Sequence, residues 1–277
     1  MKHIDVAASI QKSNSDFLKK LPRFLIRIVE KVVKQDEINA ILNKYADAKG
    51  AEFQRGVATE LNITIKIDGL ENLPESGRCF FAANHPFGII DGMVLTKTLL
   101  EKYGDLRAIG NDAFLLIPNL RPYIAMVNVY GRSSRESIAE LDKIYNSDLP
   151  ISHFPAGEVS RRYHGRIQDC DWQKSFISKA VSCKRDIVPF YFHGRNSLLF
   201  YSINLFRRAL GIKLNIELML LPSELFKKKN KTVRLTIGHP ICWEKFDNSS
   251  THQQWAQKVK AYVYGLKENG PHGPEFK

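Results

Sequence analysis

The sequence predicts an α/β fold: one domain with a central, mostly parallel mixed sheet flanked by helices, preceded by a basic amphipathic helical region. Three observations support this fold class. Short apolar or alternating runs recur after residue 61, segments with apolar residues at helical spacing separate them, and proline or glycine marks many junctions. We therefore expect a helical N-terminal region at residues 1–60 and a larger domain at residues 61–277.

The N-terminal region is predicted to be helical and basic. Apolar residues from Phe24 to Val33 repeat at helical spacing. The basic residues between them are Arg23, Arg27, Lys31 and Lys34. Such a helix is able to lie in an anionic membrane surface with its apolar face down. Most amphipathic helices instead pack on the protein's own core, so both interpretations remain open.

The elements of the larger domain follow in order along the chain. Residues 62–68 alternate as in a strand, and residues 78–83 form a short apolar run typical of a buried strand. Further strands are expected at residues 106–109, 125–129, 151–154, 186–192, 214–220 and 232–237. Helices are expected at residues 91–103, 134–145, 175–182, 198–210 and 251–266. Pro189 lies inside an apolar run, which favours a strand near an edge of the sheet or near a ligand.

Composition limits the classes of function. The 277 residues include 41 Lys and Arg against 29 Asp and Glu, a net charge of +12, and 44% are hydrophobic. These values exclude a disordered, collagen-like or coiled-coil chain. The basic excess indicates an anionic partner: nucleic acid, an anionic membrane, an acidic carrier protein or a phosphorylated ligand. Because the basic residues are scattered and no standard binding motif is present, we do not expect a nucleic-acid partner.

Cysteine usage and hydropathy bear on the compartment. The four cysteines form no Cys-x-x-Cys pair, so we expect no disulfide framework, no zinc site and a reducing compartment. No signal peptide is apparent, and no segment approaches the roughly 18 apolar residues that a membrane-spanning helix needs. We expect a cytoplasmic protein that is soluble or associates peripherally with the inner face of the membrane.

The segment NHPFGIIDG, residues 84–92, is the strongest candidate for chemistry. It connects a predicted buried strand to a predicted helix, which is where open α/β sheets place ligands. A tight turn at Pro86 and Gly88 would fold His85 back toward Asp91, which we expect at the helix N-cap. A carboxylate on one imidazole nitrogen fixes the tautomer, so that the other nitrogen takes a proton from an attacking hydroxyl or amine. The alternative is that Asp91 only caps the helix and His85 is an ordinary loop residue.

Three further segments are candidates, and the first two are turns that follow predicted strands. Residues 154–162, FPAGEVSRR, have backbone amides and arginines suited to a phosphate or carboxylate. Residues 130–136 contain Gly131 and Arg132, and the alternative there is a simple helix capping box. The fourth segment is Val188-Pro189. For residues 154–162 the alternative is an ordinary surface loop.

In this order and spacing, the four segments resemble the blocks of the glycerolipid acyltransferase superfamily, the family of lysophosphatidic acid acyltransferase. His85 and Asp91 resemble its His-x4-Asp block, Gly131-Arg132 its second block, residues 154–161 its FPEGTRS block and Val188-Pro189 its fourth. The resemblance covers residues 60–245. It implies that His85 and Asp91 are catalytic. The substrate-binding residues that it implies are Asn84, Gly88, Arg132, Phe154, Pro155, Gly157, Glu158, Ser160 and Arg161.

Two departures from the family pattern bear on the substrate. The spacing here is His-x5-Asp, and Ala156 replaces the acidic residue of FPEG, while Glu158 follows the glycine. Because that acidic residue handles glycerol phosphate in the family, its loss disfavours a glycerol-phosphate acceptor. The segments NHPFGIIDG, FPAGEVSRR and GRNSLLFY resemble a hemolysin-like subgroup that includes glycine lipid and, more distantly, ornithine lipid N-acyltransferases.

This subgroup implies a specific reaction. A 3-hydroxyacyl group would pass from an acyl carrier protein thioester to the α-amine of an amino acid such as glycine or ornithine. His85 would act as general base, Arg132 and Arg161 would bind the acceptor carboxylate or the carrier's phosphate, and amides at the helix start would stabilise the oxyanion. We expect no metal and no cofactor besides the thioester co-substrate, which is carried by acyl carrier protein or coenzyme A.

Two other functions stay open. The first is O-acylation of lysophosphatidic acid or another lysophospholipid. The second is a membrane-active or lipid-binding protein without catalysis, which would leave His85 and Asp91 without a role. The expected partners are acyl carrier protein, the amino acid or lysolipid acceptor, and an anionic membrane surface. Residues 17–34 and 198–210 are the candidates for the membrane-facing or chain-binding elements, with ordinary core helices as the alternative.

Overall fold

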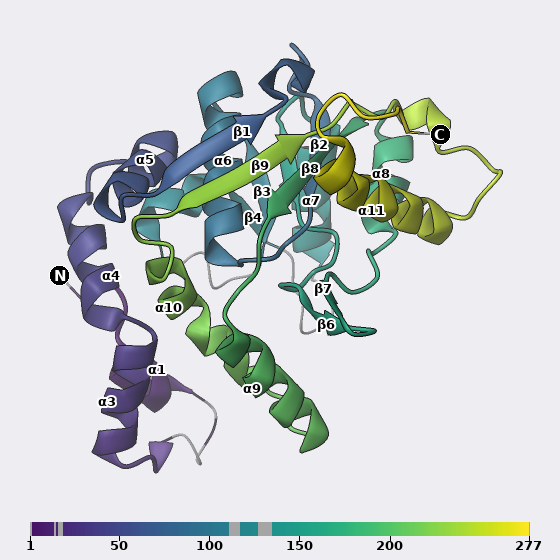
Figure 1. The fold of residues 1–277 in the computed structure, drawn as a ribbon. Helices are drawn as coiled ribbons and strands as arrows, with labels where there is room; N and C mark the ends of the chain where they lie inside the picture. Colours follow the sequence, from purple (N-terminus) through teal and green to yellow (C-terminus); the bar gives the residue numbers. More distant parts are fainter. Residues whose placement is uncertain (1, 14, 16–18, 111–116, 127–134, 277) are drawn as a thin grey trace.

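The computed structural model describes residues 2–13, 15, 19–110, 117–126 and 135–276, and it is an α/β fold around one large sheet (Figure 1). The sheet has seven strands in the order β1-β9-β8-β2-β5-β3-β4. Neighbouring strands are parallel except β8 and β9, which are antiparallel. The predicted mostly parallel mixed sheet is therefore confirmed. The strands are β1 (Thr64–Asp68), β2 (Cys79–Ala83), β3 (Arg107–Gly110), β4 (Ile124–Met126), β5 (Ile151–His153), β8 (Asp186–His193) and β9 (Thr232–Ile237).

Helices precede the sheet and cover both of its faces. Those of the N-terminal region are α1 (Val6–Lys12), α3 (Arg23–Val32), α4 (Gln35–Lys44) and α5 (Gly50–Glu60). Those that follow are α6 (Ile89–Tyr103), α7 (Arg135–Asn146), α8 (Ser175–Ser182), α9 (Leu198–Ala209), α10 (Leu221–Phe226) and α11 (His252–Asn269). Short 3₁₀ turns are η1 (Leu70–Asn72), η3 (Pro118–Tyr123), η4 (Ile216–Leu220) and η5 (Trp243–Lys245). A small antiparallel hairpin of β6 (Arg161–Tyr163) and β7 (Arg166–Gln168) lies beside the sheet.

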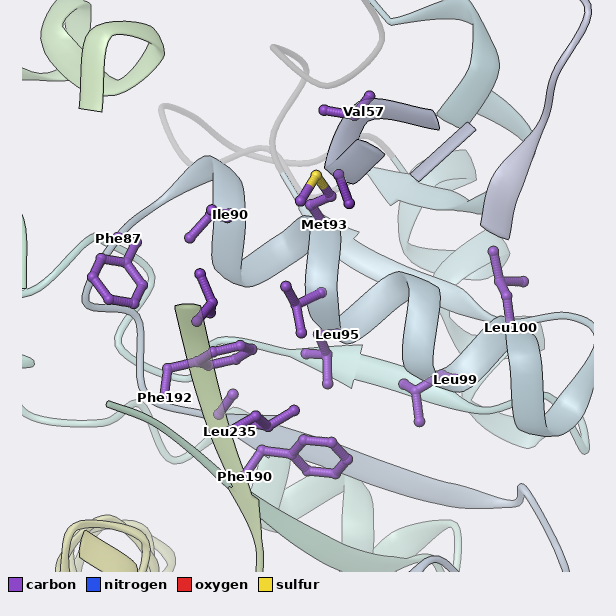
Figure 2. Close-up of a cluster of buried hydrophobic side chains, with 14 of the residues drawn as sticks. Val57, Phe87, Ile90, Met93, Leu95, Leu99, Leu100, Phe190, Phe192 and Leu235 are labelled. Carbon is purple, nitrogen blue, oxygen red and sulfur yellow. The ribbon is translucent and has the colours of Figure 1, made fainter. Parts of the chain in front are cut away.

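Strand alternation creates one core on each face of the sheet. In β2, Phe81 and Ala83 pack with α5 and α6 on one face, whereas Phe80 and Ala82 pack with α8 and α11 on the other. Figure 2 shows the first core, where Leu95 and Leu99 of α6 approach Phe190 and Leu235. Burial of each large apolar side chain contributes roughly 1.5–3 kcal/mol, so these two layers hold β2 and α6, and hence the turn between them, in place.

The structure corrects two expectations. Residues 214–220 do not form a strand, because Ile216–Leu220 is the 3₁₀ turn η4 that leads directly into α10 and turns Glu217 inward. The strand that contains Pro189 is central rather than at an edge. Pro189 is tolerated there because its pairing changes register: Ile187 bridges Ile241, but Phe190 pairs with Ile237, one residue out of step.

The N-terminal helices differ in how they contact the rest of the chain. Phe53 and Val57 of α5 are buried in the same core as α6, whereas α3 has no buried residue. Figure 1 shows α3 and α9 extending away from the sheet on the same side of the molecule. Within the described residues, we find no helix with the length and apolarity that crossing a membrane requires.

Candidate active site

The candidate site lies at the carboxyl edge of the central strands. Because β2 is parallel to both β5 and β8, the segments that follow these three strands meet at one edge of the sheet. Asn84 fixes the start of the turn after β2. Its side-chain Nδ2 donates to the carbonyl of Phe192 at 3.0 Å, and its Oδ1 accepts from the amide of Phe192 at 2.6 Å. Asn84 thus continues the β2–β8 pairing by one step, and both ends of its amide are engaged by backbone.

His85 and Asp91 meet across the longer spacing. The Nδ1 atom of His85 lies 3.0 Å from Oδ2 of Asp91. The same oxygen accepts the backbone amides of Phe87 at 2.8 Å and Gly88 at 2.9 Å. Gly88, not Asp91, is the N-cap, and Asp91 is the third residue of α6, from which it reaches back over the turn. The extra residue is therefore absorbed by a tight turn that the Asp91 carboxylate closes.

Burial and hydrogen bonds act in opposite directions on Asp91. Its side chain is fully buried, and burial raises the pKa of the carboxyl, while the hydrogen bonds from His85 and the two turn amides lower it. The side chain of His85 is 13% exposed, so the imidazole is reachable from outside. The amides of Phe87 and Gly88 are committed to Asp91. These two amides are therefore not the oxyanion donors that the sequence led us to expect at the helix start.

Gly88 is required by the turn itself. Its φ is +85° and its ψ is −104°, and an added Cβ would lie 2.9 Å from Leu221. We expect Gly88→Ala to lower the free energy of unfolding by about 1–3 kcal/mol, because it adds backbone strain and a clash. Acyl transfer should fall with it, since His85 would lose its alignment with Asp91. Urea denaturation and steady-state rates measure both effects, and Gly92→Ala is the matched control because its Cβ would meet no atom within 4 Å. An unchanged stability and rate in Gly88→Ala would contradict this account of the turn.

The segment after β5 supplies the wall of the site. The ring of Phe154 stacks on the His85 imidazole with centroids 4.0 Å apart and an interplanar angle of 23°. The amide of Gly157, whose φ is +70°, donates to the carbonyl of Phe154 at 2.9 Å, so the turn closes on itself. The carbonyl of Pro155 accepts the amide of Gln173 at 2.9 Å. Ala156 is 3% exposed and packs in the second core. The place of the family's acidic residue is thus occupied by a buried methyl group.

The remaining predicted residues divide into those near His85 and those held elsewhere. Ser160 is near: its amide donates to the carbonyl of His85 at 2.8 Å. Glu158 accepts a hydrogen bond from the hydroxyl of Tyr163. Arg161 is buried, and its Nη2 lies 3.1 Å from Oε1 of Glu217.

The ion pair of Arg161 belongs to a larger buried cluster. The Arg161 guanidinium also lies 4.8 Å from the centroid of the Phe200 ring. Glu217 is shared with Arg207 of α9, whose Nε is 2.9 Å from its Oε2. Arg161 therefore anchors α9 and η4 to the hairpin, and a role in binding the acceptor stays a prediction. Gly131 and Arg132 lie outside the described residues, whereas Val188 and Pro189 lie beside Phe81 and Ala82 of β2.

Two acidic residues of this region were missed by the sequence analysis. Asp169 hydrogen-bonds the backbone of His85, and Glu217 pairs with Arg161. Both are fully buried. Glu217 lies in an apolar run that suggested a strand, and Asp169 lies in the polar segment between β7 and α8. The one available sequence signal was that Glu217 is an acidic residue inside an apolar run. This signal does not show that Arg161 is the partner of Glu217, or that His85 is the partner of Asp169.

A histidine–aspartate pair at the carboxyl edge of a mostly parallel sheet is the arrangement that the acyltransferase resemblance implies. The chain belongs to the family described as Acyltransferase, whose model matches residues 8–272. This membership confirms the glycerolipid acyltransferase resemblance and identifies the chain as an enzyme.

Relatives cover nearly the whole chain. It is 39% identical over 264 residues to the lyso-glycine lipid O-acyltransferase of Phocaeicola vulgatus, covering 95% of each chain. It is 38% identical to the lyso-glycine lipid O-acyltransferase of Bacteroides thetaiotaomicron, covering 95% of this chain and 97% of the relative. It also resembles the crystal structure of the 1-acyl-sn-glycerophosphate acyltransferase PlsC from Thermotoga maritima, with a TM-score of 0.49 and 16% identity. That match covers 95% of this chain and 87% of the other.

Proposed function

We propose that this enzyme is an O-acyltransferase that esterifies a hydroxyl group of a lyso-glycine lipid with an acyl group from a thioester donor. The observation that carries the proposal is the His85–Asp91 pair, with Nδ1 bound to a buried carboxylate and the imidazole partly exposed. The names of the two relatives that cover 95% of the chain supply the acceptor. The proposal takes up the O-acylation alternative in place of the amino-acid amine.

The proposed mechanism depends on which of the two imidazole nitrogens of His85 is bound to Asp91. Asp91 holds Nδ1, which leaves Nε2 of His85 to accept the hydroxyl proton as the alcohol oxygen attacks the thioester carbonyl. The tetrahedral intermediate then collapses, the carbon–sulfur bond breaks, and the thiolate takes the proton from His85. No covalent enzyme intermediate is required. Asp91 stabilises the imidazolium while it exists.

Proton accounting favours a hydroxyl over an amine. A hydroxyl is neutral near pH 7 and gives up one proton during attack, which one general base handles. The α-amine of an amino acid is an ammonium at that pH and must lose one proton before attack and another afterwards. Among the described residues, the imidazole of His85 on the Asp91 carboxylate supplies one general base, which matches the simpler requirement. Transfer to an amine, with the 3-hydroxyacyl donor that the sequence suggested, is the second candidate.

We also propose that the acyl donor is a thioester of acyl carrier protein or coenzyme A, and that the enzyme binds a membrane surface. The net charge of +12 suits an acidic acyl carrier protein, and coenzyme A carries the same phosphopantetheine thioester. A lysolipid acceptor resides in a membrane. The side of α9 and the segment after it that faces solvent carries Leu198, Leu199, Leu205, Phe206, Leu210, Ile212 and Leu214, which we name the apolar surface of α9. We propose that this surface and the basic helix α3 bind an anionic membrane.

The acceptor is tested with the purified chain. A palmitoyl thioester on acyl carrier protein or coenzyme A is offered with lyso-glycine lipid, lysophosphatidic acid or glycine in parallel. We expect the fastest product to form on lyso-glycine lipid and to be cleaved by mild alkali, because esters hydrolyse under conditions that amides survive. A faster product on lysophosphatidic acid, or an alkali-resistant amide on glycine, would overturn the proposed acceptor. Mass spectrometry reads out each product.

A further inference from the structure

A second buried carboxylate lies behind the backbone of His85. Asp169 is 1% exposed and lies in the segment between β7 and α8. Its Oδ1 accepts the backbone amide of His85 at 3.2 Å and the hydroxyl of Ser160 at 2.5 Å. Its Oδ2 accepts the indole Nε1–H of Trp172 at 2.9 Å. Both oxygens are thus occupied by three donors, all of them neutral groups.

These contacts hold the backbone of His85 on both sides. The amide of His85 donates to Asp169, and its carbonyl accepts the amide of Ser160, whose hydroxyl returns to the same Asp169 oxygen. Together these hydrogen bonds form a closed ring that joins Asp169 to His85, 84 residues away along the chain, and to Ser160, 9 residues away. Because the peptide groups on either side of His85 are fixed, the direction of its Cα–Cβ bond is fixed as well.

We propose that Asp169 is a positioning residue for acyl transfer: it holds the His85 main chain so that the imidazole keeps its contact with Asp91 and its stacking on Phe154. A carboxylate suits this place because every group that faces it is a donor. An amide at residue 169 would turn an NH₂ group toward at least one N–H or O–H donor and lose that bond. The inference rests on the proposed role of His85 as general base.

The main chain at residue 169 is anchored independently of its side chain. Its amide donates to the Tyr264 hydroxyl at 2.7 Å, and its carbonyl accepts Nζ of Lys260 at 3.0 Å, both in α11. These bonds persist in Asp169→Asn. The variant is therefore expected to keep the segment on α11. It weakens the contacts to His85 and Ser160 in either orientation of the amide, because a neutral amide oxygen accepts more weakly than a carboxylate and an NH₂ group does not accept at all.

The test compares Asp169→Asn with Trp172→Phe. Both variants disturb the bond between residues 169 and 172, but Trp172→Phe leaves the carboxylate and its contacts to His85 and Ser160 intact. In Asp169→Asn we expect kcat to fall by about 10- to 100-fold, because a small misplacement of a catalytic group is enough for such a loss. The acceptor KM should stay within about twofold, and the acid limb of the pH–kcat profile should shift. In Trp172→Phe, kcat and the pH profile should remain near those of the wild type.

The outcomes separate this inference from the proposed function. If His85→Ala is inactive and Asp169→Asn has a wild-type kcat and pH profile, the positioning role is wrong while the role of His85 stands. If His85→Ala is fully active, both are wrong. If both Asp169→Asn and Trp172→Phe lose kcat in proportion to their thermal stability, Asp169 is structural and the inference is overturned. Should Asp169→Asn not fold, Ser160→Ala removes one bond of the ring, and an unchanged kcat and pH profile there would also overturn it.

Discussion

Replacing His85 with alanine should lower kcat for acyl transfer by about 10²- to 10⁴-fold, the usual contribution of a positioned general base. The replacement removes both imidazole nitrogens: Nδ1, which Asp91 holds, and Nε2, which is proposed to accept the hydroxyl proton. The effect should appear in kcat more than in the KM of the acceptor, because proton transfer occurs in the transition state. Discontinuous rate assays with a radiolabelled acyl thioester measure the decrease in kcat.

The fold should survive this replacement. His85 follows β2 in a turn that Asn84 and Ser160 hold through hydrogen bonds that do not involve the imidazole. His252→Ala, which changes the first residue of α11, is the matched control and should have wild-type activity. A near-normal kcat in His85→Ala would show that the reaction proceeds without this base.

Introducing two serines into the apolar surface of α9 should weaken binding to anionic vesicles by about a hundredfold. Phe206 and Leu210 are 71% and 74% exposed, and each contributes roughly 1.5 kcal/mol or more when it is buried in lipid. We expect Phe206→Ser with Leu210→Ser to leave the fold intact, because the buried face of α9 consists of Phe200, Tyr201 and Asn204. Vesicle co-sedimentation measures the partition coefficient.

The control for this surface lies at the other end of the sheet. Leu70 is 51% exposed in η1, just after β1, and β1 runs parallel to β9 and therefore antiparallel to β8. The end of β1 thus lies opposite the edge that carries α9. Leu70→Ser should leave vesicle binding unchanged. Equal binding by the wild type and the double serine variant would show that α9 does not face the membrane.

Apolar patterning was enough to predict the sheet. Parallel strands covered on both faces are apolar along their whole length, as in Cys79–Ala83, and these runs were found at nearly the right residues. The same signal misled at residues 214–220. There, Leu214 and Met219 are exposed apolar side chains and Leu220 is the N-cap of α10, so the apolar run reflects a surface and a helix start.

Local contacts in the site were predictable, and distant ones were not. His85 and Asp91 lie six residues apart, and the turn residues between them made it possible for the two side chains to meet. Asp169 reaches His85 across 84 residues, and no local pattern encodes such a contact. Arg161 has the residue type of an anion-binding group, yet its position beside buried Glu217 depends on how η4 folds back.

We propose that this chain esterifies a lyso-glycine lipid through His85. The most direct measurement is lipid mass spectrometry of cells that contain lyso-glycine lipid and express either the wild type or His85→Ala. We expect the wild type alone to convert the lysolipid to a product one acyl ester heavier, which mild alkali returns to the lysolipid. Unchanged lyso-glycine lipid in wild-type cells, or equal conversion by His85→Ala, would contradict it.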